Sequence, residues 1–454
     1  MRYIPHTPEE TQQMLKSVGL RSVAELFSSI PESLHMEKPL NLPEPLDEAS
    51  LFRHLEALAG KNRIAAPHRS FLGGGVYRHF IPSAVKNLIQ RSEFVTPYTP
   101  YQPEIAQGTL QVIFEFQTMA AEMFGMEVAN ASLYDGSTAL GEAILMALRL
   151  QPKRKIVLIP RCLHPEYRQT VQSLLKNFDV SLVEIPLSPT GGVDPGAVGD
   201  YLKEEIAACV FPYPNFFGIV ENNRELIQRI KDQGGLIIFC VTEPLSLGLF
   251  ESPGALGADI VCGEGQSLGL APSFGGPFVG LFATKEKYVR QMPGRLCGMT
   301  TDSKGRRGFV LTLATREQHI RRERATSNIC TNQALCATQM TVYLSLLGKQ
   351  GFQKLAQLNW QRAEYAKETL TQIKGINLAY PKVVTFNEFV LKLPTAADLV
   401  LKELKQKEIE GGIALGRWYP ELGNALLVNV TELNETEDIE NFAAALKETV
   451  HGLP

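Results

Sequence analysis

The feature that most constrains this chain is an alternation of short apolar runs and helical segments between residues 155 and 283. Six runs have the length and the near-continuous apolar character of buried strands: 155–159, 180–185, 208–211, 236–241, 259–262 and 277–283. Segments with helical spacing of apolar residues separate them, for example 164–177, 195–203 and 223–233. This alternation predicts an α/β fold with a mainly parallel sheet that helices cover on both faces.

The flanking regions have other patterns. Long apolar helices are expected at 110–124 and 137–150, before the sheet. Helices dominate from 329 to 374, and strands are expected near 389–393 and 425–430. We therefore expect a large α/β domain over residues 61–325 and a smaller C-terminal α+β domain over residues 326–454.

Residues 1–60 are expected to form a separate helical and extended arm. Thr7 can cap a helix that Pro8 begins, and Glu10 completes a capping box. The Pro-rich stretch from Pro31 to Pro45 then fits either an arm lying on another surface or a plain linker.

Composition excludes several classes of protein. A net charge of −3 argues against a dedicated nucleic-acid binder. The seven cysteines contain no C-x-x-C pair, which indicates reduced thiols rather than a disulfide framework. The N-terminus lacks an apolar signal region, and no apolar run approaches the roughly 18 residues that span a bilayer. The eight histidines show no close metal-ligand spacing. We expect a cytoplasmic protein without a metal site or a membrane partner.

A candidate anion site lies at the start of the helix expected at 137–150. Gly136, Ser137 and Thr138 follow Asp135 there, and free N–H groups at a helix start attract phosphate. A simple N-cap explains the same four residues, and for this tetrapeptide alone it is the favoured interpretation.

The order of these parts resembles the large domain of fold-type I pyridoxal-phosphate enzymes. The resemblance implies that the helix start holds the cofactor phosphate, that strand 236–241 ends in an Asp, and that a lysine follows strand 259–262. No lysine lies between Lys231 and Lys285, and Gln266, followed by Ser267, stands at the lysine position. The strand-end Asp is also missing, with Glu243 placed beyond it. These two losses predict a degenerate cofactor site.

Four stretches narrow the family: 71–75 (FLGGG), 98–108 (YTPYQPEIAQG), 274–277 (FGGP) and 315–331 (TREQHIRRERATSNICT). They resemble the N-terminal half of the glycine cleavage system P-protein. The chain has about half the length of the one-chain form, so it is similar to the separate first subunit of the two-chain form. The resemblance implies a seven-stranded sheet, an α2β2 assembly, and pyridoxal phosphate on a lysine-bearing second subunit. It further implies glycine decarboxylation and transfer of the aminomethyl group to the lipoyl arm of the H-protein.

The 98–108 stretch is a candidate contributor to the partner's active site. Three prolines stiffen it, and its polar and aromatic residues are Tyr98, Thr99, Tyr101, Gln102, Glu104 and Gln107. A tether that packs on its own domain is the alternative. The glycine run at 73–75 likewise fits a tight turn or a loop that approaches the partner's pocket.

The 315–331 stretch is a second candidate interface. On a helix, Arg321 and Arg324 would share a face, with Arg316 partly elsewhere. Guanidinium groups there suit a carboxylate, a phosphate or an acidic partner surface, and an intersubunit salt-bridge network is an equal alternative. Asn328 and Thr331 are possible polar groups at a helix start. Two other functions remain open: a scaffold or regulatory pseudoenzyme, and a complete enzyme that uses Lys285 or Lys304.

Overall fold

A computed structural model of the chain describes residues 5–36, 38, 40–62, 66–96 and 99–453. The chain divides into two compact units, Met1–Ile64 and Ala65–Pro454. In the first unit, helix α1 (Pro8–Ser17) has the predicted capping box between Thr7 and Glu10. Helix α2 (Glu48–Ala59) follows. Leu15 is the only buried hydrophobic residue among those described in this unit, so these residues form no core of their own.

The second unit is built on a seven-stranded sheet. Its strands, in spatial order, are β1 (Val128–Ala129), β7 (Gly280–Thr284), β6 (Ile260–Glu264), β5 (Leu236–Val241), β4 (Ile206–Pro212), β2 (Ile156–Pro160) and β3 (Ser181–Ile185). Strands β2 to β6 run parallel, whereas β7 is antiparallel to β6 and to β1. The predicted mainly parallel sheet is confirmed, and each predicted strand lies within three residues of its observed bounds.

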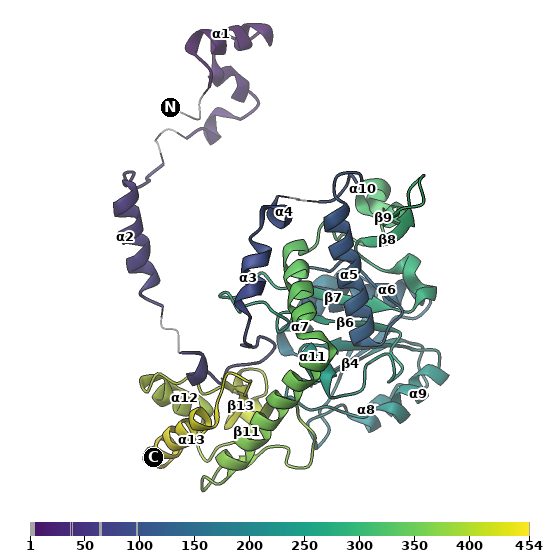
Figure 1. Ribbon diagram of the computed structural model, residues 1–454, viewed down its shortest axis with the longest axis vertical. Helices are drawn as coiled ribbons and strands as arrows, with labels where there is room; N and C mark the ends of the chain where they lie inside the picture. Colours follow the sequence, from purple (N-terminus) through teal and green to yellow (C-terminus); the bar gives the residue numbers. More distant parts are fainter. Residues whose placement is uncertain (1–4, 37, 39, 63–65, 97–98, 454) are drawn as a thin grey trace. The chain divides into compact units, whose positions relative to one another are not determined.

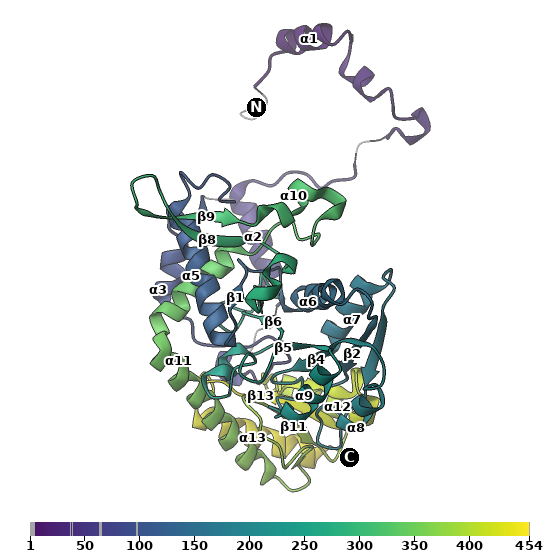
Figure 2. The ribbon, with the colours of Figure 1, turned by 90° about the vertical axis from the view of Figure 1, so that its right-hand side faces the viewer.

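Helices cover both faces of this sheet (Figures 1 and 2). Helices α6 (Gly136–Leu150) and α7 (Pro165–Leu175) pack on one face. Helices α5 (Gln107–Phe124), α8 (Pro195–Asp200), α9 (Arg224–Asp232) and the first part of α11 (Ala334–Thr371) pack on the other. Successive strand residues alternate between the two cores: Cys209 and Phe211 face one, Ala208 and Val210 the other. Strand β4 is therefore buried on both faces, whereas the edge strand β3 is partly exposed.

A smaller antiparallel sheet lies in the C-terminal part. Its strands, in spatial order, are β10 (Asn377–Leu378), β11 (Glu388–Lys392), β13 (Ala425–Asn429) and β12 (Ile413–Ala414). Helices α12 (Ala397–Gln406) and α13 (Thr436–Gly452) share a core with it. A separate hairpin joins β8 (Leu296–Thr301) to β9 (Arg307–Thr312). The expected domain boundary at residue 325 stays a prediction.

The 315–331 stretch does not form one helix, so Arg321 and Arg324 do not share a helical face. Helix α10 (Gln318–Arg321) ends where Arg322 takes a φ of 53°, and Arg324 lies in a following 3₁₀ turn. Helix α11 begins at Ala334, which leaves Asn328 in an irregular segment before it. Across the described ranges, no helix is both long enough and apolar enough to cross a bilayer.

Candidate functional site

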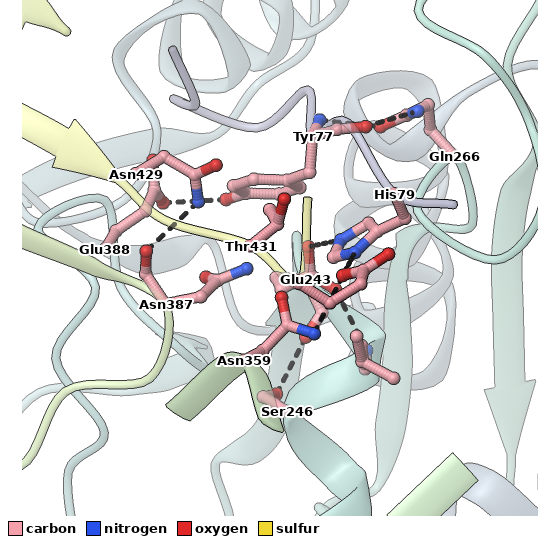
Figure 3. A network of polar contacts seen from close by, with 12 residues as sticks. Tyr77, His79, Glu243, Ser246, Gln266, Asn359, Asn387, Glu388, Asn429 and Thr431 are labelled. Atoms are coloured by element: carbon pink, nitrogen blue, oxygen red, sulfur yellow. Dashed lines mark hydrogen bonds and ion pairs between the residues drawn. The ribbon is translucent and has the colours of Figure 1, made fainter. Parts of the chain in front are cut away.

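Gln266, at the position expected for the lysine, is buried directly after β6 (Figure 3). Its side-chain Oε1 accepts a hydrogen bond from the Tyr77 backbone N–H at 2.8 Å. Its Nε2 donates to the backbone oxygens of Tyr77 and Leu270, at 2.9 and 2.7 Å. The Gln266 amide therefore both accepts from and donates to the backbone of Tyr77, and we call this pair of hydrogen bonds the Gln266 clamp. The neighbouring Ser267 hydroxyl is also buried, and it has no hydrogen-bond partner in the described part of the chain.

The start of α6 is occupied by two carboxylates of this chain. Asp135 caps the helix, as the simpler interpretation predicted, by accepting from the Thr138 N–H at 2.8 Å. Glu264 accepts from the Gly136 N–H at 2.9 Å. A Cβ added at Gly136 would lie 2.4 Å from the Tyr167 hydroxyl, so the helix start is closely packed. Glu264 thus lies at the positive end of the helix dipole, where a phosphate would otherwise bind.

The Glu264 carboxylate receives three backbone N–H groups in all. Besides Gly136, Val279 and Gln266 donate to it at 3.0 and 3.1 Å. Burial raises the pKa of Glu264 to about 8, and these hydrogen bonds oppose the rise because they favour the charged form. The group is fully engaged within the fold.

At the glycine run 73–75, the backbone packs closely against neighbouring side chains. Gly74 and Gly75 have φ values of 72° and 95°. The Gly74 N–H donates to Glu388 at 2.6 Å, and its carbonyl oxygen accepts from Nε2 of His164 at 2.6 Å. A Cβ at Gly73 would lie 2.2 Å from Glu388 Oε1. The run therefore forms a tight backbone turn that packs within this chain, and only glycine fits there.

His79 lies between two buried carboxylates (Figure 3). Its Nδ1 is 2.8 Å from Glu432 Oε2, and its Nε2 is 3.4 Å from Glu243 Oε2. Burial alone would lower the pKa of His79, but the two carboxylates outweigh burial and raise this pKa to about 10. The imidazole is protonated at neutral pH. Glu243, the carboxylate nearest the place of the expected Asp, is consequently already paired.

Glu388 ties the same segment to the smaller sheet. It begins β11, and the Tyr77 hydroxyl donates to its Oε2 at 2.8 Å. Burial raises the pKa of Glu388 to about 7. Figure 3 shows Tyr77 and His79 on one passing segment, with Gln266 on one side of it and Glu388 on another. Residues 70–80 are thus fixed to both sheets; we call the cluster of Tyr77, His79, Glu243, Glu264, Gln266, Glu388 and Glu432 the closed half-site.

The closed half-site does not fit pyridoxal phosphate. Position 266 offers an amide instead of an amine, and an amide cannot form a Schiff base. Two N–H groups at the α6 start are bonded to Asp135 and Glu264. Glu243 is held by His79.

The 99–112 region contrasts with the closed half-site. Tyr98 lies outside the described residues. Tyr101, Gln102 and Glu104 are exposed, Thr99 is half-buried, and Ile105 is 82% exposed. With helix α4 (Ser92–Val95) and the start of α5, this region borders an open hollow of about 960 Å³. We call residues 93–96 and 99–112 the open loop surface.

Two predicted interface residues instead bind backbone of their own chain. The Gln107 amide accepts from the Phe309 N–H and donates to the Phe309 carbonyl, both at 2.8 Å, so it attaches the loop to β9. The buried Arg316 guanidinium donates to carbonyl oxygens, including that of Gly294 at 3.0 Å. Arg321 and Asn328 remain exposed.

Arg295 is a residue that the sequence reasoning missed. It is buried just before β8 and donates from Nη2 to the Tyr101 hydroxyl at 3.2 Å and to the Cys330 carbonyl at 3.0 Å. It therefore joins the two stretches, 98–108 and 315–331, that stood out in the sequence. A single arginine after Pro-Gly belongs to no recognisable motif, so only the structure reveals it.

The sheet order, the helical layers and the second small sheet define the class of fold-type I pyridoxal-phosphate-dependent enzymes. The sphingosine-1-phosphate lyase of Burkholderia pseudomallei has this fold, with a TM-score of 0.67, 14% identity, and 94% of each chain covered. The glutamate decarboxylase of Lactobacillus brevis has it too, with a TM-score of 0.67, 12% identity, and 94% and 98% covered. The predicted fold class is confirmed.

The family follows from closer matches. The family model described as glycine cleavage system P-protein matches residues 1–446. The probable glycine dehydrogenase (decarboxylating) subunit 1 of Sphingopyxis alaskensis is 49% identical, with 99% of this chain and 100% of that protein covered. The crystal structure of a glycine decarboxylase (P-protein) in inhibitor-bound form superposes with a TM-score of 0.87, at 42% identity, covering 99% of this chain and 100% of that chain. This chain belongs to the glycine cleavage system P-protein family.

Proposed function

We propose that this chain is the first subunit of a two-chain glycine dehydrogenase (decarboxylating) and supports an active site centred on a second, lysine-bearing subunit. The relatives named subunit 1 match it over their full length, which favours a division of the enzyme into two chains. In the proposed α2β2 assembly, pyridoxal phosphate is bound by the second subunit. Glycine is decarboxylated there, and its aminomethyl group passes to the lipoyl arm of the H-protein.

The observation that carries this proposal is the Gln266 clamp. A chain that has the family fold but lacks the amine needs another chain to supply it. Gln266 is also firmly held, because all three of its amide hydrogen bonds are to backbone groups of this chain. Lys285 and Lys304 do not replace the amine: Lys285 pairs with Asp259 at 2.6 Å, and Lys304 is exposed next to β9.

The open loop surface is the part that we propose reaches the partner. An exposed apolar side chain such as Ile105, beside the aromatic Tyr101 and the polar Gln102 and Glu104, has the composition of a protein interface. Tyr98 and Thr99 belong to the same proposed contact. Arg321 and Asn328 are exposed on the 315–331 stretch, and we propose them as polar contacts at its edge.

We place the assembly in the cytoplasm. All seven cysteines are free thiols, and six of them are buried. Free thiols are maintained in reducing compartments, which supports this location.

The test is reconstitution from purified chains. This chain alone, the lysine-bearing subunit alone and the mixture are each incubated with pyridoxal phosphate, and the aldimine absorbance is recorded before and after borohydride. Exchange of the glycine carboxyl with bicarbonate is then measured with lipoylated H-protein. We expect a reducible aldimine only in samples that contain the second subunit, and full exchange only in the mixture.

Three results decide against the proposal. A reducible aldimine on the isolated chain would show a complete enzyme. Full exchange by the second subunit alone would make this chain a scaffold or regulatory pseudoenzyme. No exchange in the mixture would reject the assigned reaction.

A further inference from the structure

Arg295 contacts the open loop surface from the interior of the fold. Its side chain is buried, whereas Tyr101, which it contacts, is 57% exposed. Nη2 uses both of its hydrogens, one for the Tyr101 hydroxyl at 3.2 Å and one for the Cys330 carbonyl at 3.0 Å. The guanidinium carbon also lies 5.4 Å from the centre of the Tyr101 ring. The exposed aromatic ring is therefore attached to the core through a buried arginine.

The other side of Arg295 is attached to the turn that leads into α6. Nη1 donates to Asn332 Oδ1 at 3.3 Å. The Asn332 amide in turn donates to the Ala131 carbonyl at 2.7 Å, and the Arg295 carbonyl accepts from the Ala131 N–H at 2.9 Å. Ala131 is fully buried beside the sheet. Arg295 thus connects the loop, through hydrogen bonds, to the buried backbone at Ala131.

Geometry, more than charge pairing, fixes this side chain. The nearest carboxylate, Glu317 Oε2, is 3.7 Å from Nε, which has no hydrogen-bond partner in the described ranges. The three hydrogen-bonded acceptors are neutral oxygens from two segments: Tyr101 lies in the loop, and Cys330 and Asn332 lie in the segment before α11. A planar guanidinium can serve them at once because its donors are fixed in a fork, whereas a lysine ammonium is a compact point charge without that fork.

We propose that Arg295 is the positioning residue that holds Tyr101 and its loop in the orientation that the partner's active site requires. This inference rests on the proposed function. Arg295 acts through Tyr101 and itself touches no substrate. Misplacement of a positioning group by about 1 Å costs up to about 100-fold in rate, so even a conservative change at this position affects turnover.

The experiment compares Arg295→Lys, Arg295→Met and Tyr101→Phe with wild type. Arg290→Lys, at an exposed arginine in the 3₁₀ segment Glu286–Gln291, is the matched control. Each full-length variant is assembled with the lysine-bearing subunit. The measurements are the affinity of assembly, kcat and KM for glycine–bicarbonate exchange, and backbone hydrogen exchange.

We expect Arg295→Lys and Arg295→Met to lower kcat by about tenfold or more, with assembly affinity and KM within about threefold of wild type. Hydrogen exchange should accelerate at residues 99–107 and 326–333 and stay unchanged in α6 and β4. Tyr101→Phe should show part of the loss and add little when combined with Arg295→Lys, because both changes remove the same hydrogen bond. Arg290→Lys should match wild type.

Unchanged kcat in both arginine variants would overturn the inference, as would accelerated exchange across the whole unit, which would mark a general structural role. Full additivity of Tyr101→Phe and Arg295→Lys would also overturn it. Failure of the proposed function gives a different result, because the wild-type mixture itself would then show no glycine–bicarbonate exchange. Even in that case, unaltered hydrogen exchange at residues 99–107 in the variants would reject the positioning role.

Discussion

The closed half-site and the open loop surface use polar groups in opposite ways. In the closed half-site, Gln266, Glu264 and His79 are buried, and the hydrogen bonds of each end on groups of the same chain. On the open loop surface, Tyr101, Gln102 and Glu104 are exposed beside the apolar Ile105. One region is complete in itself, whereas the other presents groups that a second protein can contact.

This contrast indicates which of the two regions can contact a ligand or a second protein. Buried charges persist when they are paired, as His79 is with Glu243 and Glu432, and buried polar groups persist when they are hydrogen-bonded, as Glu264 is to three backbone N–H groups. These groups are therefore already engaged within the fold. Chemistry at the closed half-site would first have to break these contacts. The open loop surface requires no such change, because Tyr101, Gln102, Glu104 and Ile105 are already exposed.

The largest effect is expected from His79→Ala. The change leaves Glu243 and Glu432 buried without their cation, so it should lower the free energy of unfolding by about 3–5 kcal/mol. Urea denaturation at pH 7 measures it. His68→Ala, at an exposed histidine, is the control and should stay within about 0.5 kcal/mol of wild type. A loss at His79 no larger than in this control would mean that the imidazolium does not hold the closed half-site together.

Gln266→Lys should destabilise the chain and still fail to create a cofactor site. A lysine can donate to the Tyr77 carbonyl but cannot accept from the Tyr77 N–H, and one unsatisfied buried group costs about 1–3 kcal/mol. Added pyridoxal phosphate should give no borohydride-stable adduct. Ser267→Ala is the matched control, because its buried hydroxyl has no hydrogen-bond partner among the described residues. A pyridoxyl adduct on residue 266 would show that the half-site is open after all.

Stability should fall as the pH rises above neutrality. The pKa of His79 is about 10 in the folded chain and about 6.5 when unfolded. Its stabilising contribution is therefore complete below about pH 6.5 and is lost as the pH rises through 10, because the folded state binds the extra proton. The raised pKa values of Glu388 and Glu264 act with the same sign, between the unfolded value of about 4.5 and about 7 and 8.

Denaturation midpoints at several pH values measure this dependence. A single group changes the free energy of unfolding by at most about 1.4 kcal/mol per pH unit, so roughly 2 kcal/mol should be lost between pH 7 and pH 9. His79→Gln should flatten the curve in this interval. A wild-type curve that rises between pH 7 and pH 9 would refute the proposed protonation of His79.

The smallest effect on the isolated chain is expected on the open loop surface. Ile105→Asp replaces a side chain that is 82% exposed, so the free energy of unfolding should change by less than about 0.5 kcal/mol. Assembly with the lysine-bearing subunit should weaken by about tenfold or more, as measured by analytical ultracentrifugation. Leu399→Asp, at an exposed leucine of α12, is the control and should assemble normally. Equal weakening by both changes would argue against a specific interface at Ile105.

Local patterns predicted the frame of the molecule well. Periodicity predicted several elements closely, among them strands β2, β4 and β5 and helices α6 and α9. It could do so because the spacing of apolar residues in a buried element depends only on residues that are near in the sequence. The capping box at Thr7 and Glu10 was likewise readable, since its partners are three residues apart. Within the 315–331 stretch, the end of α10 could not be predicted, because the positive φ of Arg322 leaves no signal in residue type.

The candidate site was predicted only in part. Gln266 was found because the place of an expected lysine can be located in the sequence. Glu264 and Arg295 were missed, since neither belongs to a motif and their partners come from distant segments. Gln107 and Arg316 were noticed, but the sequence could not show that their side chains bind backbone groups of their own chain.

The residue pattern was enough to predict the order of the elements, the glutamine at position 266 where the family resemblance implies a lysine, and the stiff, Tyr-rich loop at 98–108. Only the tertiary structure decided what these features contact. Gln266 finds the Tyr77 backbone 189 residues away, and His79 finds Glu432 353 residues away. Short-range periodicity carries no information about such pairs. They form because folding brings buried polar groups together, and each must find a partner there or remain unsatisfied at a cost in stability.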